Sequence, residues 1–260
     1  MFWRTGMLSV ERYEKILEEL NKQGVVKVAE LSKKFSVTEK TIRGDLEYLE
    51  KKGYLKRVHG GAILPEGDVD LFPINKRQAK HSKEKMAIAR AALATIQSGE
   101  TILMDGGSTT LALAQLLGDF PVTVITNDIK IANSLFEKEK VHLLVLGGMR
   151  IGISSSLISS EALEMLKTIH VDRLFLGTTA VDVTSGLSVF NSLHADWKKR
   201  AIQCADRVTL LADSTKFGKV ALLQFASIEE VDEIITDHQI NQAILEQLKH
   251  LNLPVIIAND

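Results

Sequence analysis

The chain has 260 residues, of which 45% are hydrophobic, and its formal net charge is −1. This length accommodates one large domain or two smaller ones, with enough apolar residues for a sizeable core. No uncharged apolar run reaches the roughly 18 residues that a membrane-spanning helix needs. The N-terminus lacks the pattern of a secretory signal, so we expect a cytoplasmic protein with no membrane partner. Cys204 is the single cysteine, which excludes an internal disulfide and a thiolate metal cluster.

Charge is distributed unevenly along the chain. Residues 1–64 contain 13 Lys and Arg against 9 Asp and Glu, whereas residues 65–260 contain 19 against 24. A basic module followed by an acidic one is the asymmetry expected when only one end of a protein meets DNA. A solvated surface is the alternative explanation for so small an excess.

Three short segments near the N-terminus have apolar residues at helical spacing. The first segment ends at Gly24, and the third begins after Thr38, a good N-cap. A strand-like run over residues 54–59, the turn residues Gly60 and Gly61, and a return over residues 62–64 predict a small hairpin. Together these elements predict a winged helix-turn-helix domain over residues 7–64. The apolar positions are Val10, Tyr13, Leu17 and Leu20, then Val28, Leu31 and Phe35, then Ile42, Leu46 and Leu49.

The third predicted helix has the properties of a DNA recognition helix. Such a helix lies in the major groove with its N-terminal residues at the base edges, and Arg43 suits a bidentate contact to guanine. Basic residues after it would contact phosphates and make binding salt-dependent. A small helical bundle that binds protein is the alternative. The predicted DNA-binding residues are Thr38, Glu39, Lys40, Thr41, Arg43, Gly44, Lys51, Lys52, Lys56, Arg57 and His59.

This module resembles the N-terminal domain of the DeoR family of bacterial sugar-catabolism regulators. The resemblance rests on residues 37–46, on residues 49–53, and on the Arg-Val-His-Gly-Gly-Ala run over residues 57–62. The family usually has a second arginine where this chain has Gly44. Glycine inside a helix costs about 1 kcal/mol relative to alanine, and its presence removes a DNA contact. We therefore expect Gly44 either to shift operator preference or to weaken DNA affinity.

A polar segment rich in turn formers, residues 65–70, predicts a linker, which we place at residues 65–75. Over residues 76–260, short apolar runs alternate with helical patterns, which predicts a doubly wound α/β domain with a parallel sheet. The predicted strands cover residues 101–104, 122–126, 142–146, 173–176, 208–211, 233–236 and 255–258. The predicted helices cover residues 76–96, 109–117, 130–136, 160–167, 195–205 and 241–251.

Glycine and hydroxyl residues follow five of the predicted strands in succession. Parallel sheets bind ligands at the carboxyl ends of their strands. Glycines allow a ligand to approach the backbone, and hydroxyls with helix N-terminal amides suit a phosphate. In the first of these loops Ser108 is also the expected N-cap, and in the last Lys216 offers a positive charge. Turn and capping chemistry is the alternative for each loop taken alone.

These loops resemble the DeoR-family sensor domain, which is related to ribose-5-phosphate isomerase. The likeness extends over about residues 85–219 and implies a phosphorylated sugar or sugar alcohol as the effector, with Ser108, Thr109 and Thr110 at the phosphate. His194 stands where a glutamate is usual, and Ser159 where a glycine is common. The expected effector-binding residues are Asp105, Gly106, Gly107, Ser108, Thr109, Thr110, Thr126, Asn127, Gly147, Gly148, Gly177, His194, Lys198 and Lys216.

The resemblance implies a repressor of a carbohydrate-utilisation operon that is released by its effector, and two-fold operators imply a homo-oligomer, a dimer or a tetramer. We expect no cofactor, and no metal, because the histidines lack zinc-like spacing. A sugar-phosphate isomerase or deaminase is the alternative, since Asp105, Asp128, His194 and Asp213 lie in suitable loops for a general base. A third hypothesis is a DNA-binding protein whose second domain serves only for oligomerisation.

Overall fold

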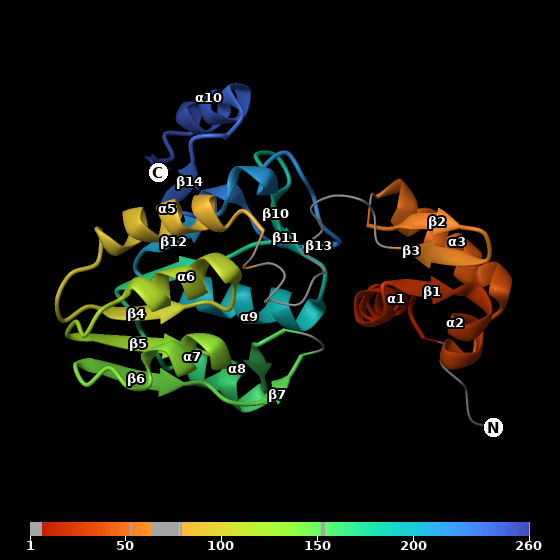
Figure 1. Ribbon diagram of the computed structural model, residues 1–260, viewed down its shortest axis with the longest axis horizontal. Helices are drawn as coiled ribbons and strands as arrows, with labels where there is room; N and C mark the ends of the chain where they lie inside the picture. Colours follow the sequence, from red (N-terminus) through yellow and green to blue (C-terminus); the bar gives the residue numbers. More distant parts are fainter. Residues whose placement is uncertain (1–6, 53, 64–77, 79, 152–153, 260) are drawn as a thin grey trace. The chain divides into compact units, whose positions relative to one another are not determined.

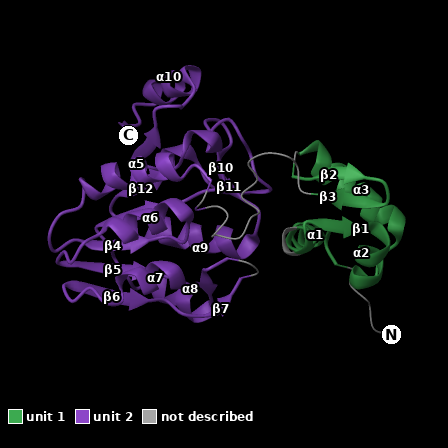
Figure 2. Cartoon of the chain, in the orientation of Figure 1, with its two compact units in different colours: residues 1–73 green, residues 74–260 purple. Residues whose placement is uncertain are grey.

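The computed structural model describes residues 7–52, 54–63, 78, 80–151 and 154–259. The chain divides into two compact units, residues 1–73 and residues 74–260 (Figure 2). The predicted linker, residues 65–75, lies outside the described residues.

Unit 1 is a three-helix domain with a small antiparallel sheet, as the sequence predicts. Gly24 ends the first helix with a φ of 75°, a conformation that glycine adopts without strain. The backbone N–H of Thr41 donates to the Thr38 hydroxyl at 3.2 Å, which confirms Thr38 as the N-cap of the third helix. The helices are α1 (Ser9–Gln23), α2 (Val28–Phe35) and α3 (Glu39–Lys51); the strands, in the order β1-β3-β2, are β1 (Val25–Lys27), β2 (Lys56–Val58) and β3 (Gly61–Ile63).

The predicted apolar stripes form the core of unit 1, except at two positions of α1. Leu17, Leu31 and Leu46 are each buried, and Ile16 joins them. Of the four apolar positions predicted on one face of the first helix, Leu17 and Leu20 are buried, Tyr13 is half-buried and Val10 is 44% exposed. Strand β1 was not predicted, because three residues between two helices are too few to show a period of two.

A buried ion pair fixes the rotation of α3 against α1. The Arg12 guanidinium donates to both carboxylate oxygens of Asp45, at 2.5 and 2.8 Å, and both side chains are buried. The hydrogen bonds to Asp45 raise the pKa of Arg12, so this cation stays charged. Since Asp45 is on the inner face of α3, the pair directs the opposite face of that helix to the solvent.

Unit 2 is built on a seven-stranded parallel sheet with the order β15-β14-β12-β9-β4-β5-β6 (Figure 1). All seven predicted strands are present within one residue of their predicted ends. Strands buried on both faces are continuous apolar runs, which a sequence shows clearly. The strands are β4 (Thr101–Met104), β5 (Val122–Thr126), β6 (Val141–Val145), β9 (Arg173–Leu176), β12 (Val208–Leu211), β14 (Glu233–Asp237) and β15 (Val255–Ala258).

Helices cover both faces of this sheet, as a doubly wound fold requires. One apolar core lies under α5, α6 and α7, and a second lies under α8, α9 and α10 (Figure 1). The helices are α5 (Ser82–Leu93), α6 (Ser108–Leu116), α7 (Ile129–Leu135), α8 (Ser160–Leu166), α9 (Ser192–Gln203) and α10 (Gln242–His250). Among the described residues no helix is long and apolar enough to span a membrane.

The strand order reverses direction between β4 and β9. From β4 the chain adds β5 and β6 on one side, and later adds β9, β12, β14 and β15 on the other. Ligands of open α/β sheets bind at the carboxyl ends of the strands at such a switch point. A ligand-binding site is therefore expected at the segments that follow β4 and β9.

Unit 2 contains two further small sheets that were not predicted. Strands β10 (Ala180–Asp182), β11 (Gly186–Val189) and β13 (Leu223–Ala226) form an antiparallel sheet, and β7 (Met149–Arg150) pairs with β8 (Leu157–Ile158). The turn Thr184-Ser185-Gly186 was an available hairpin signal. Gly186 has a φ of 72°, and a Cβ there would lie 2.2 Å from the Ala226 carbonyl oxygen, so this position requires glycine.

The buried cysteine is expected to be unreactive in the native protein. Cys204 ends α9 and is 5% exposed, and burial raises the pKa of its thiol to about 11. Because the thiolate is the reactive form, alkylation by iodoacetamide at mildly alkaline pH should be slow in the native protein and fast in denaturant, as followed by mass spectrometry. Equal rates in the two states would contradict this.

Candidate functional site

The outer face of α3 carries the residues predicted to read DNA. Thr38, Glu39, Lys40, Arg43 and Gly44 are exposed, and Thr41 is half-exposed. Arg43 donates to the Glu39 carboxylate at 2.6 Å along the same face. A base contact by Arg43 therefore requires it to leave this exposed partner, which costs little because surface ion pairs contribute little.

The wing is held to α3 by one arginine. The backbone N–H and the side chain of Arg57 both donate to the Glu50 carboxylate, each at 2.7 Å. These hydrogen bonds lower the pKa of Glu50. Arg57 thus positions the hairpin, and the other basic residues predicted to meet phosphates are exposed around it: Lys51, Lys52, Lys56 and His59.

Gly44 lies in open space, since a Cβ built there has no atom within 4 Å. Gly44→Ala should therefore raise the free energy of unfolding of unit 1 by about 1 kcal/mol, the helix propensity difference. Native-state hydrogen exchange of the α1 and α3 amides measures this. Gly24→Ala is the matched control: at a φ of 75° the same change should destabilise the unit. If both variants stabilise unit 1, or if neither does, the helix-propensity explanation for Gly44 is contradicted.

In unit 2 the glycine loop after β4 packs closely against polar side chains of neighbouring loops. A Cβ on Gly106 would lie 2.2 Å from Ser156 Oγ and 2.9 Å from Asp128 Oδ2. Gly107 is the N-cap of α6, and Ser108 is its first helical residue, so the expectation that Ser108 is the cap was wrong. Thr110 is fully buried, and its hydroxyl donates to the Gly107 carbonyl at 3.0 Å. The loop therefore presents the first amides of α6 with no side-chain cap over them.

Asp105 is the centre of a buried polar cluster at the switch point. Its carboxylate accepts from Lys198 Nζ, from Trp197 Nε1 at 3.2 Å and from the Gly177 amide at 3.0 Å. Lys198 also donates to the Gly177 carbonyl at 2.8 Å. Asp105 is 2% exposed and Lys198 5% exposed. The structure thus brings together three of the predicted residues, from the ends of β4 and β9 and from α9.

The loop after β5 is also buried and hydrogen-bonded. Thr126 donates to the Met104 carbonyl at 2.8 Å, and Asn127 Nδ2 donates to the Leu157 carbonyl at 2.9 Å. Asn127 Oδ1 is buried and has no hydrogen-bond partner among the described residues. An unsatisfied buried acceptor is costly, so this atom is available to a hydroxyl donor. Asp128 caps α7 and accepts from Ser155 Oγ at 2.6 Å.

The remaining predicted residues differ in their surroundings. Gly147 lies in open space, whereas a Cβ on Gly148 would collide with the Ile158 carbonyl, so Gly148 serves the β7–β8 pairing. His194 is half-buried in the first turn of α9, four residues before Lys198 and hence on the same helix face. Lys216 is half-buried in a 3-10 turn, Ser214–Lys216, after β12.

Two residues of this region, Trp197 and Asp213, were not among the expected effector-binding residues, and the sequence offered Asp213 only as a general base for the enzyme alternative. Trp197 contacts Asp105 as described, and no motif signals that role. Asp213 is 1% exposed, and its Oδ2 has no hydrogen-bond partner among the described residues. Within the described part of the chain, no group of three or more His, Cys, Asp or Glu is placed to hold a metal ion.

Breaking the Asp105 cluster should destabilise unit 2. Asp105→Asn leaves the Lys198 ammonium buried without a charged partner, a loss of roughly 3–5 kcal/mol for such pairs. This loss of unfolding free energy is measured by urea unfolding, with Trp197 fluorescence as the signal. Glu164→Gln removes the partner of Lys167 in an exposed pair and should leave the transition where it is. A wild-type midpoint for Asp105→Asn would show that the pair contributes no stability.

These features define a DNA-binding transcriptional regulator with a ligand-sensing domain, and the comparisons identify which kind. The model of the DeoR-like helix-turn-helix domain matches residues 12–67, and the model of the DeoR C terminal sensor domain matches residues 80–238. The chain belongs to the DeoR family. Its regulator relatives cover nearly the whole chain, so the isomerase or deaminase alternative is not supported.

Three relatives illustrate the similarity. The HTH-type transcriptional regulator YulB of Bacillus subtilis is 38% identical and covers 96% of each chain. The putative aga operon transcriptional repressor of Escherichia coli O157:H7 is 34% identical, over 96% of this chain and 94% of that one. The glycerol-3-phosphate regulon repressor of Escherichia coli K12 is 33% identical, over 89% and 92%. Among solved structures, ribose 5-phosphate isomerase A of Methanocaldococcus jannaschii is 20% identical with a TM-score of 0.40, over 54% of this chain and 56% of that one.

Proposed function

We propose that this regulator represses a carbohydrate-utilisation operon and releases its operator when a phosphorylated sugar or sugar alcohol binds unit 2. The names of two relatives, a repressor of the aga operon and a repressor of the glycerol-3-phosphate regulon, support the repressor sign and the effector class. We propose further that the DNA-binding domain comprises residues 7–64 and the sensor domain residues 76–260, and that the protein is cytoplasmic.

The glycine loop before α6 carries the proposal. Gly106 and Gly107 leave the amides of the first α6 turn uncapped at the switch point, where a phosphate would accept from them. Ser108 and Thr109 are the hydroxyl donors at that turn. Thr110 we assign to holding the loop, because its hydroxyl already bonds the Gly107 carbonyl.

The sugar moiety would extend from this loop along the ends of the neighbouring strands. Asn127 Oδ1 is the acceptor we assign to a sugar hydroxyl, since no described residue satisfies it. Lys198 and His194 approach from one face of α9, and Lys216 from the turn after β12. Gly177 follows β9, between β12 and β4 in the sheet, and Gly147 follows β6, next to β5 at the edge of the sheet. The effector can change DNA binding only if it binds the two DNA-affinity states differently.

The test separates effector binding from operator binding. The wild-type protein is screened by thermal shift against pentose, hexose and glycerol phosphates, and a ligand at about 100 times its Kd should stabilise by about 2.7 kcal/mol. Fluorescence anisotropy then measures the affinity of the protein for DNA. The DNA is a sequence that the protein has selected from a random-sequence library. We expect a stabilising sugar phosphate to weaken this affinity. No stabilisation by any compound would contradict the effector class.

Ser108→Asp tests the phosphate site directly. A carboxylate at the first residue of a helix favours the helix dipole, so folding should persist, but it repels a phosphate at the same amides. We expect loss of the thermal shift and of the effector response, with wild-type DNA affinity. Ser82→Asp is the matched control, because Ser82 is the exposed first residue of α5. Retained binding by Ser108→Asp would place the phosphate elsewhere.

Lys216→Ala tests the basic group at the site. We expect it to abolish the effector response while leaving operator binding intact, because the lysine is assigned to the ligand and not to DNA. Loss of both activities together would count against that assignment.

A further inference from the structure

The first residue of the recognition helix is an exposed acid. Glu39 follows the Thr38 cap directly and begins α3. The N-terminal residues of a recognition helix are the ones that reach the base edges. A carboxylate at this end complements the helix dipole, but it also approaches a polyanion, which repels it. The position of Glu39 therefore raises the question of what this carboxylate meets on DNA.

In the free protein the charge of Glu39 is neutralised by Arg43, one turn further along α3. Arg43 Nη2 donates to Glu39 Oε2 at 2.6 Å, and the two side chains are 63% and 47% exposed. A bidentate contact to guanine O6 and N7 needs two N–H groups of the guanidinium in one plane with the base. Arg43 therefore leaves Glu39 when it takes a guanine, and an exposed pair costs little to break.

The departure of Arg43 leaves the Glu39 carboxylate without its partner at the base edges. The nearest hydroxyls are engaged, because Thr38 Oγ1 and Thr41 Oγ1 bond each other at 2.9 Å and the Thr41 amide donates to Thr38. A charged acceptor that loses water without gaining a donor is destabilising. The base pair beside Glu39 therefore decides whether this carboxylate favours or opposes binding.

We infer that Glu39 reads a cytosine, by accepting a hydrogen bond from its N4 amine in a base pair adjacent to the guanine that Arg43 contacts. In the major groove cytosine presents this donor, and acidic side chains pair with it. Guanine O6 and thymine O4 are acceptors and repel a carboxylate. Adenine offers its N6 donor beside the N7 acceptor, which faces the second carboxylate oxygen. Glu39 thus selects cytosine mainly by rejecting the other three bases.

The two residues divide the reading of the operator between them. Arg43 supplies the donors for a guanine, and Glu39 supplies the acceptor for a cytosine, from positions four residues apart on one helix face. In the absence of DNA each neutralises the other. Base preference is measured without the effector, so failure of the phosphate site in unit 2 leaves this assignment intact.

The test compares the full wild-type chain with Glu39→Gln and Glu39→Ala. The wild type selects DNA from a random-sequence library, and anisotropy titrations at one salt concentration then measure all four bases at each position of the selected sequence. At one position cytosine should bind about tenfold more tightly than guanine or thymine. Glu39→Gln should change the preference there to adenine, because glutamine pairs with adenine N6 and N7. Glu39→Ala should abolish the preference at that position.

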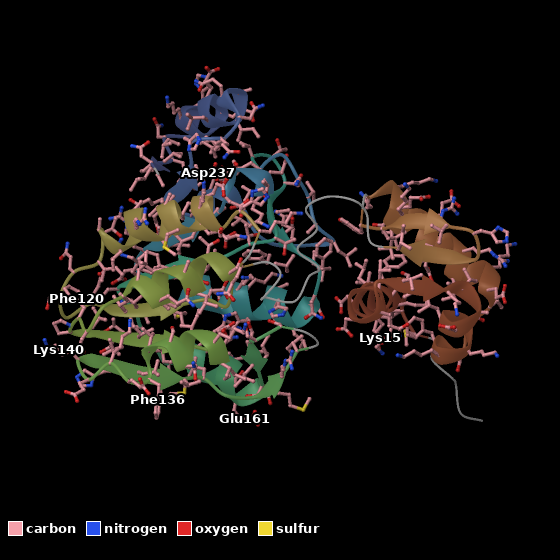
Figure 3. All side chains as sticks on the ribbon, in the orientation of Figure 1. Lys15, Phe120, Phe136, Lys140, Glu161 and Asp237 are labelled. Carbon is pink, nitrogen blue, oxygen red and sulfur yellow. The ribbon has the colours of Figure 1, made fainter. Side chains whose placement is uncertain are left out.

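Glu11→Gln is the matched control. Glu11 accepts from Lys15 at 2.8 Å in an exposed pair of the same spacing, but on α1, where Figure 3 labels Lys15. This variant removes the same charge, so it shares any general gain in DNA affinity and should keep every base preference. Circular dichroism checks that each variant is folded. A wild type without a cytosine preference, a preference that survives both Glu39 variants, its loss in Glu11→Gln, or a uniform change in affinity at all positions would each overturn the assignment.

Discussion

Unit 2 depends on one buried carboxylate. Asp105 ends the strand from which the sheet grows in both directions, and its two oxygens receive an indole, an ammonium and a backbone amide. Desolvating a carboxylate and an ammonium costs several kcal/mol per ion, and only good geometry with further hydrogen bonds offsets that cost. Here each ion has a second partner, so the arrangement holds α9 in one position against the ends of β4 and β9.

This cluster also determines what kind of site the switch point can be. Asp105 is fully engaged as an acceptor, which leaves the adjacent glycine loop as the approach to the sheet. Uncapped amides at the start of α6 attract anions, and a carboxylate already neutralised by Lys198 repels them less than a free one would. The same ion pair thus stabilises the fold and makes the loop beside it compatible with a phosphate.

Local sequence patterns predicted most of the fold, whereas contacts between residues distant in sequence could not be predicted. The strands of the parallel sheet were predictable because their apolar runs are continuous, and Thr38 because capping acts over three residues. The side-chain partners of Asp105 are 92 and 93 residues away in sequence. Lys198 was included only through resemblance, and Trp197 was not included at all. The β7–β8 pair has two residues per strand, too short for any periodicity.

Each of the two units contains a buried ion pair that fixes the orientation of a helix. In unit 1 the Arg12–Asp45 pair lies between α1 and α3, and in unit 2 the Lys198–Asp105 pair lies between α9 and the sheet; each joins elements whose apolar contacts alone would tolerate small rotations. Apolar packing is non-directional, but a carboxylate with two fixed donors admits one orientation. A recognition helix has to present one face to the groove, and a phosphate loop has to present its amides at one angle. Buried ion pairs at these two places therefore supply orientation where the rest of each core supplies mainly stability.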